Sequence, residues 1–114
     1  MDFHDKYTFQ QRSREALNIM GKYPNSLPII VQNGPSSTLP LIDKNKFLVP
    51  KDITFGEFVY VIRKRLKLKE YQSIFVFVNR TLPLNTKLIS VLYDEHSEDD
   101  NFLYCYIQGE NVFG

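Results

Sequence analysis

The residues that could perform nucleophilic catalysis are one cysteine and two histidines. Cys105 lies between Tyr104 and Tyr106 in an alternating stretch typical of a strand, whereas His4 is near the start of the chain and His96 is in an acidic segment. Catalysis by a cysteine needs a thiolate that is activated by a positioned base. We therefore interpret Cys105 as a buried, unreactive thiol.

Acidic side chains are concentrated between residues 94 and 101, which the sequence predicts to be a loop. Neighbouring acids on a loop are normally a solvated surface rather than a general acid and base pair. We expect this of five residues, namely Asp94, Glu95, Glu98, Asp99 and Asp100. The sequence also lacks metal-ligand spacing and a glycine-rich phosphate loop. It therefore predicts a protein that is not an enzyme and that needs no metal or cofactor.

A basic run could bind nucleic acid; it consists of Arg63, Lys64, Arg65, Lys67 and Lys69. However, the run falls at the C-terminal end of a predicted helix, where cations interact favourably with the helix dipole. No aromatic residues alternate with the cations to stack on bases. We therefore predict a solvated helix end and no nucleic-acid partner, while binding of this run to acidic partners stays open.

Length and composition predict one domain in a reducing compartment. The chain has 114 residues, of which 43% are hydrophobic, enough to form a single core. One cysteine cannot form an internal disulfide, and the N-terminal segment lacks the apolar region of a secretory signal. We expect a cytoplasmic protein.

Hydrophobic periodicity and turn residues predict eight segments in chain order. Thr8 with Gln11 and Thr54 with Glu57 have the spacing of capping boxes, so that a helix is expected after each threonine. The segment 73–79 is almost wholly apolar, which favours a central strand covered on both faces. The expected segments are a helix in 8–24, a strand in 27–32, a loop in 33–43, a strand in 46–50, a helix in 54–66, a strand in 73–79, a short helical segment near 88–92 and a strand in 102–107.

This order predicts an α+β protein with the β-grasp arrangement of ubiquitin. A hairpin followed by a helical crossover and further strands forms a mixed four-stranded sheet with the long helix on one face. Additional N-terminal helices are expected, and the amphipathic one should cover the other face. We divide the single domain into an N-terminal helical extension (1–24), a β-grasp core (25–107) and a flexible tail (108–114).

The strand at 46–50 has the composition of a sheet edge. Lys44, Lys46 and Pro50 surround Phe47, Leu48 and Val49. Lysine and proline at an edge protect a sheet against aggregation, which is a sufficient explanation alone. The same edge could instead accept an extended peptide through backbone hydrogen bonds. Composition leaves both alternatives open.

Several stretches, in this order, resemble the autophagy ubiquitin-like modifiers, the GABARAP-type family: "IDKNKFLVP", "FVYVIRKRL", "IFVFVN", "TLP", "FLYCYI" and "GENVFG". The resemblance covers essentially the whole chain. It implies that Gly114, with Phe113 as a recognition residue, is conjugated to phosphatidylethanolamine on autophagosomal membranes. The implied partners are ubiquitin-like activating and conjugating enzymes and a cysteine protease that cuts the lipid amide. The alternative is a ubiquitin-like interaction module in vesicle trafficking that is never conjugated.

The resemblance also implies that cargo receptors and autophagy factors dock peptides with an aromatic-x-x-aliphatic motif on the edge strand. The first implied pocket consists of Glu15, Ile19, Pro28, Ile30, Lys46, Leu48 and Phe102. The second consists of Phe47, Val49, Pro50, Ile53, Phe58, Val61 and Arg65. Ser26 replaces an arginine that is common in the family, which should alter the preference for acidic flanks. A further surface around Phe75 and Phe77 is used by some members, although we expect these side chains to be core.

Overall fold

The centre of the molecule is a mixed four-stranded sheet, in a computed structural model that describes residues 2–35 and 37–110. Its strands lie in the order β2-β1-β4-β3. Their bounds are Ser26–Asn33 (β1), Lys46–Pro50 (β2), Phe75–Val78 (β3) and Leu103–Gln108 (β4). β1 is antiparallel to β2 and parallel to β4, and β3 is antiparallel to β4. The predicted β-grasp topology is confirmed.

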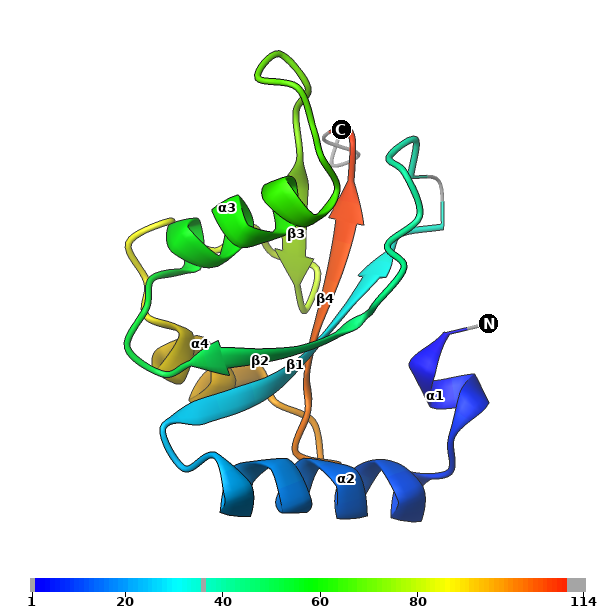
Figure 1. The fold of residues 1–114 in the computed structure, drawn as a ribbon, viewed down its shortest axis with the longest axis vertical. Coiled ribbons are helices and arrows are strands. Elements are labelled where there is room, and N and C mark those ends of the chain that lie inside the picture. Colours follow the sequence, from blue (N-terminus) through cyan, green and yellow to red (C-terminus); the bar gives the residue numbers. More distant parts are fainter. Residues whose placement is uncertain (1, 36, 111–114) are drawn as a thin grey trace.

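The two longest helices lie on opposite sides of this sheet (Figure 1). They are α2 (Phe9–Lys22) and α3 (Phe55–Arg65), and each begins with the predicted capping box. In the first box, the Thr8 hydroxyl accepts from the Gln11 amide at 3.2 Å, while the Gln11 side chain accepts from the Thr8 amide at 2.9 Å. Both orphan donors at the helix start are thereby satisfied.

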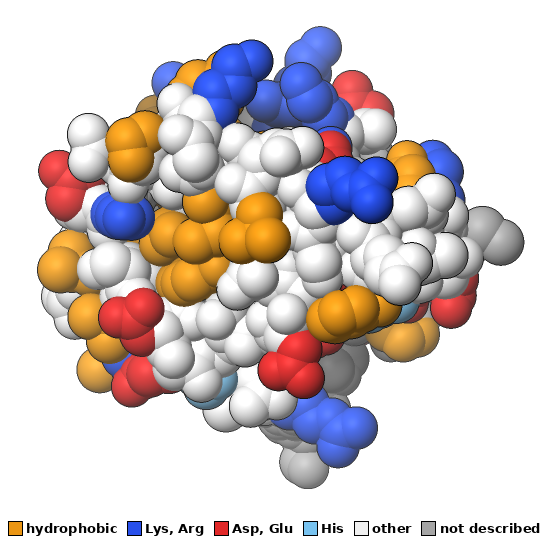
Figure 2. Space-filling model, turned by 90° about the horizontal axis from the view of Figure 1, so that it is seen from below, with side chains coloured by type: hydrophobic (Ala, Val, Ile, Leu, Met, Phe, Trp, Pro, Cys, Tyr) orange, Lys and Arg blue, Asp and Glu red, His pale blue; other side chains and the backbone are white. Residues whose placement is uncertain are grey.

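Alternation along β1 and β4 divides the core into two clusters. Leu103, Cys105 and Ile107 pack with α3 and with α4 (Ile89–His96), because odd-numbered side chains of β4 point to that face. Phe102 and Tyr104 point to the other face and pack with Ala16 of α2 and with Phe3. The sheet is therefore buried on both faces, one by each group of helices. Figure 2 views the molecule from the side of α2, where a group of apolar side chains lies among charged side chains of both signs.

A short helix precedes α2; the sequence analysis expected additional N-terminal helices but gave this one no bounds. It is α1 (Phe3–Lys6), and the Asp2 side chain caps it by accepting from the Asp5 amide. A single turn is too short to show helical periodicity. Phe3 is buried and meets Phe102 edge to face, with ring centroids 5.2 Å apart, so packing rather than intrinsic propensity holds this turn.

Three sequence-based expectations need correction. The strand of the segment 73–79 is β3, which lies at an edge of the sheet rather than at its centre. Its apolar composition reflects burial of Val76, Phe77 and Val78 on both faces, which does not require a neighbour on each side. In the acidic segment, α4 continues through His96, and Asp100 is buried instead of solvated.

The flexible tail that the sequence analysis placed at residues 108–114 also begins too early. Gln108 is the last residue of β4, pairs with Phe75 and is only 6% exposed. A polar residue at the end of an apolar strand gives no signal that the ladder continues, since the pairing is a backbone interaction. Residues 111–114 of the predicted flexible tail lie outside the described residues.

Replacing Leu103 by alanine is expected to lower the free energy of unfolding by about 2 to 5 kcal/mol, because the fully buried side chain leaves a cavity between β4 and the helices. Leu84→Ala is the matched control, since Leu84 is 74% exposed and should cost less than about 0.5 kcal/mol. Urea unfolding followed by circular dichroism measures both. Equal losses would contradict the core assignment of Leu103.

Candidate functional site

The outer edge of β2 has the properties that an added strand requires. Within the described chain, β2 pairs only with β1, so its other backbone edge is free. Phe47 and Val49 are buried under α3, whereas Leu48 between them is 45% exposed on the opposite face. The edge position predicted for this strand is confirmed, and its alternate side chains point to opposite faces of the sheet.

The first predicted set of residues lies on α2, on β1 and β2, and directly before β4, and we name it the α2–β2 site. The strand register places Pro28 beside Leu48 and Ile30 beside Lys46. Ile30 and Phe102 are fully buried, so they form the base of this site rather than its surface. Its members are Glu15, Ile19, Pro28, Ile30, Lys46, Leu48 and Phe102.

An ion pair spans the α2–β2 site from one element to the other. The Lys46 ammonium group of β2 contacts the Glu15 carboxylate of α2, and each side chain is 36% exposed. Partly exposed pairs of this kind contribute little net stability, since water screens them. Either group can therefore exchange its present partner for a charged ligand at small cost.

The second predicted set surrounds α3, and we name it the α3–β2 site. Phe47, Val49 and Phe58 belong to the buried core. Arg65 lies over the Phe47 ring, with its guanidinium carbon 5.2 Å from the ring centroid. The remaining members are more accessible, namely Pro50, Ile53 and Val61. Ile53 and Val61 also line an open concavity of about 620 Å³ with Thr54, Gly56, Glu57, Tyr60, Asn85 and Thr86.

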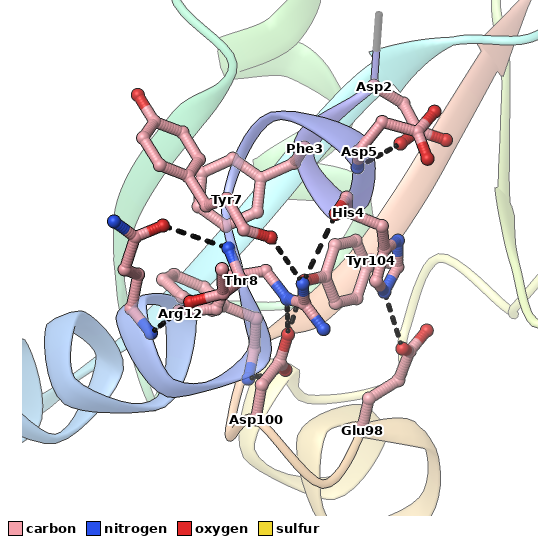
Figure 3. A network of polar contacts seen from close by, with 12 residues as sticks. Asp2, Phe3, His4, Asp5, Tyr7, Thr8, Arg12, Glu98, Asp100 and Tyr104 are labelled. Atoms are coloured by element: carbon pink, nitrogen blue, oxygen red, sulfur yellow. Dashed lines mark hydrogen bonds and ion pairs between the residues drawn. The ribbon is translucent and has the colours of Figure 1, made fainter.

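A buried carboxylate fixes α2, one wall of the α2–β2 site, against the sheet (Figure 3). Asp100 is 1% exposed, and its Oδ2 accepts from Arg12 Nε of α2 at 2.9 Å and from the Tyr104 hydroxyl. Its Oδ1 accepts from the Phe102 amide at 2.9 Å. Burial and the hydrogen bond to Asp100 raise the pKa of Tyr104 well above its usual value, so the phenol stays a donor. The bond to Asp100 also raises the pKa of Arg12.

The same arginine connects α2 to α1. Arg12 Nη1 donates to the carbonyl oxygens of Tyr7 at 2.6 Å and of His4 at 3.3 Å. The His4 ring stacks on Tyr104 with centroids 4.2 Å apart, and its Nε2 lies 2.9 Å from a carboxylate oxygen of Glu98. Sequence reasoning missed this network, because an arginine and an aspartate separated by 88 residues show no pattern.

The cysteine and the histidines do not form a catalytic group. Cys105 is 1% exposed in the cluster under α3, and burial raises the pKa of its thiol to about 12. His4 stacks on Tyr104, whose side chain belongs to the cluster on the opposite face of the sheet. An unreactive thiol is what this environment dictates.

Two further properties follow from residues 2–35 and 37–110. In these ranges, no group of three or more His, Cys, Asp or Glu side chains could hold a metal ion. None of the helices there is long and apolar enough to cross a membrane.

Phe77, which we expected to be core, is 6% exposed. Phe113 and Gly114 lie outside the described residues.

Fold and site together define a ubiquitin-like domain in which the edge strand β2, paired only with β1 among the described residues, contributes to both the α2–β2 and the α3–β2 site. A family model described as "Autophagy protein Atg8 ubiquitin like" matches residues 11–114. Autophagy-related protein 8 of Mycosarcoma maydis is 46% identical over 112 residues, which are 98% of this chain and 95% of that protein. Autophagy-related protein 8d of Arabidopsis thaliana is 45% identical, over 98% and 93% of the two chains.

Two solved structures are similar throughout. The crystal structure of Trypanosoma brucei ATG8 has a TM-score of 0.93 at 34% identity and covers 100% of this chain and 98% of its own. Plasmodium falciparum Atg8 in complex with a Plasmodium falciparum Atg3 peptide has a TM-score of 0.90 at 30% identity, over 97% and 98%. The chain therefore belongs to the Atg8 family. It is an autophagy ubiquitin-like modifier of the kind conjugated to phosphatidylethanolamine, and it is not an enzyme.

Arg12→Ala is expected to lower the free energy of unfolding by about 3 to 5 kcal/mol, because it leaves the buried Asp100 carboxylate without its cation. Arg14→Ala removes the same side chain from an exposed position of α2 and should cost less than about 0.5 kcal/mol. Denaturant titrations of both variants give the comparison. Equal stability of the two variants would mean that the pair does not hold α2.

Proposed function

We propose that Gly114 is the residue conjugated to phosphatidylethanolamine and that Phe113 is recognised by the conjugation enzymes. The family match extends to residue 114, and β4 ends at Gln108, six residues before it. Glycine has no Cβ, so a tail ending in it suits narrow enzyme clefts. The partners in this reaction are the activating enzyme, the conjugating enzyme and a delipidating cysteine protease. Plasmodium falciparum Atg8, a relative, has been solved with an Atg3 peptide.

Conjugation determines where the protein resides. Phosphatidylethanolamine has two acyl chains, each contributing about 0.8 kcal/mol per buried methylene, whereas one chain binds a membrane only marginally. The unmodified chain is therefore cytoplasmic, and the lipidated chain resides on autophagosomal and vesicle membranes. Such an anchor keeps the docking strand at the membrane.

Docking of cargo receptors and autophagy factors takes place at β2. A peptide that adds to the free edge directs alternate side chains to opposite faces, as β2 itself does. An aromatic residue and an aliphatic residue three places later then reach the α2–β2 and α3–β2 sites respectively. The single observation that carries this proposal is the unpaired edge of β2 between exposed Leu48 and exposed Val61.

Charge around β2 favours acidic residues beside the peptide motif. Lys44 and Lys46 precede the buried part of the strand, and only Lys46 has an ion-pair partner among the described residues. Ser26 at the start of β1 supplies no charge. Charges at the rim of an interface affect association rate and selectivity more than anchoring, so acidic flanks should tune rather than decide binding.

In the conjugation reaction, wild type is expected to gain the mass of phosphatidylethanolamine, and Gly114→Ala is expected to gain none. The assay contains activating and conjugating enzymes, ATP and phosphatidylethanolamine liposomes, with intact-mass analysis and flotation as readouts. A family member that is known to react serves as the control for enzyme activity. An unchanged wild-type mass beside a reactive control would favour the module that is never conjugated.

Leu48→Ala and Val61→Ala are each expected to weaken binding of an aromatic-x-x-aliphatic peptide with acidic flanks about tenfold or more, because each removes an accessible apolar contact. Isothermal titration of the folded variants measures this. Lys64→Ala and Leu84→Ala, both exposed elsewhere, should change the affinity little. Affinity that depends on Lys64 and not on Leu48 or Val61 would place docking on the basic end of α3.

A further inference from the structure

The basic run at the end of α3 lies at the same end of the sheet as the exit of the C-terminal segment. Phe75, the first residue of β3, pairs with Gln108, the last residue of β4. The α3–β3 loop (residues 66–74) therefore projects beside the point where β4 ends. Figure 1 shows this loop and the end of β4 together at one end of the longest axis.

The loops before β3 and β2 carry the two most exposed large hydrophobic side chains of the described residues. Tyr71 of the α3–β3 loop is 84% exposed, and Leu41 of the loop at residues 34–45 is 85% exposed. Single exposed apolar residues are common and need no explanation alone. Tyr71, however, belongs to the loop that leads into Phe75, which pairs with the last residue of β4, from which the segment that the proposed function joins to a lipid continues.

Positive charge predominates around Tyr71. Lys67 and Lys69 are exposed in the α3–β3 loop, and Lys64 and Arg65 precede them on α3. The nearby acidic groups include Glu70 in the same loop, Asp43 in the loop before β2, Glu110 after β4, and Asp2, which lines a concavity with Leu41. Residues 63–70 contain five cations and one carboxylate. Lys64 lies over the Tyr60 ring and Arg65 over the Phe47 ring, so Lys67 and Lys69 are the cations of the loop itself.

The α3–β3 loop is held in shape by Arg63. The guanidinium donates to the Gln72 carbonyl oxygen at 2.8 Å and to the Lys69 carbonyl oxygen at 2.9 Å. The Gln72 side chain in turn accepts from the Lys69 amide at 2.7 Å. Both hydrogen bonds of Arg63 are made to residues close to Tyr71 in the chain. The loop is therefore ordered before it binds, and binding does not have to include the entropy cost of ordering it.

We propose that the α3–β3 loop is a second, non-covalent contact with the bilayer, in which Lys67 and Lys69 bind anionic headgroups and Tyr71 enters the interface. Residues 111–114 span at most about 14 Å in any conformation, so a lipid on Gly114 keeps the membrane close to this loop. Lysine beside an anionic leaflet strengthens binding about fivefold per residue. Tyrosine has an apolar ring and a polar tip that suit the headgroup region.

A membrane fits this surface better than nucleic acid does. Binding to single strands relies on successive aromatic side chains on which bases stack. Between Arg63 and Ile74, Tyr71 is the one aromatic residue. One exposed aromatic ring in a loop that also carries two exposed lysines matches a planar charged surface instead.

The inference rests on the proposed conjugation through Gly114, and its test is built to be independent of the conjugating enzymes. The chain contains no tryptophan, so Tyr71→Trp introduces a single fluorescent reporter. Gly114→Cys, coupled to a maleimide lipid, anchors the chain at the proposed position, and the coupling is selective because Cys105 is 1% exposed. The vesicles are phosphatidylcholine with or without phosphatidylserine.

The reporter at Tyr71 is expected to shift to shorter wavelength and to be quenched by brominated lipid only on vesicles with phosphatidylserine. High salt should reverse both changes, because it screens exposed charges. For the unanchored protein, Lys67→Gln with Lys69→Gln should weaken binding to the same vesicles roughly twentyfold. Two matched controls come from the opposite end of the sheet. The double variant Lys22→Gln with Lys51→Gln should leave vesicle binding unchanged. A reporter at Tyr23→Trp should show neither the shift in wavelength nor the quenching.

Equal responses of the Tyr71 and Tyr23 reporters, or of the two double variants, would overturn the inference. A different result would also overturn it: the Tyr71 reporter stays solvent-exposed on anionic vesicles, and the protein binds RNA in a way that depends on Lys67 and Lys69. That result would assign the surface to nucleic acid. Loss of enzymatic conjugation in wild type, with the anchored reporter still responding, would refute the proposed function alone.

Discussion

The position of the N-terminal helices depends on one buried carboxylate. Asp100 lies just before β4 with almost no exposure, so its charge must be compensated within the protein. Arg12, Tyr104 and the Phe102 amide supply three donors, which is close to the capacity of a carboxylate in so small a space. Because Arg12 belongs to α2 and also donates to the carbonyl oxygens of His4 in α1 and of Tyr7 directly after it, one charge fixes both helices on the sheet. The distance between α2 and β2, and with it the width of the α2–β2 site, follows from that anchorage.

The α2–β2 and α3–β2 sites lie on opposite faces because strand side chains alternate. Along β2, Phe47 and Val49 complete the core under α3, and Leu48 is left on the face that α2 partly covers. A peptide paired with this strand, as we propose, has the same period, so its side chains are divided between the same two faces. Two sites on opposite faces of one edge therefore need no special loop. They need only a helix on each face and a free strand between them.

The sequence was sufficient for the topology, the capping boxes and the edge position of β2, since each depends on local patterns of apolar, capping and edge residues. It was insufficient where long-range contacts decide. The single turn of α1 is held by Phe3 packing on Phe102, and Asp100 is buried by an arginine 88 residues away. The apolar composition of β3 predicted burial correctly but not its place in the sheet, because burial of faces and pairing of edges are separate properties. The pocket residues came from the family resemblance, and the structure divides them into a buried base, such as Ile30, and an accessible rim, such as Leu48.

The sheet separates the surfaces that docking and anchoring require. The proposed docking uses the lateral edge at β2, whereas the chain continues toward Gly114 from the end of β4, an interior strand. An edge and an end of the same sheet face different directions, so a membrane held at the end of β4 does not cover the backbone groups of β2. The Arg12–Asp100 network lies at a third place, the turn before β4, opposite the end from which the chain leaves. A modifier that must be bound to lipid and to a receptor peptide at the same time needs this separation, and the β-grasp topology supplies it by placing the last strand inside the sheet.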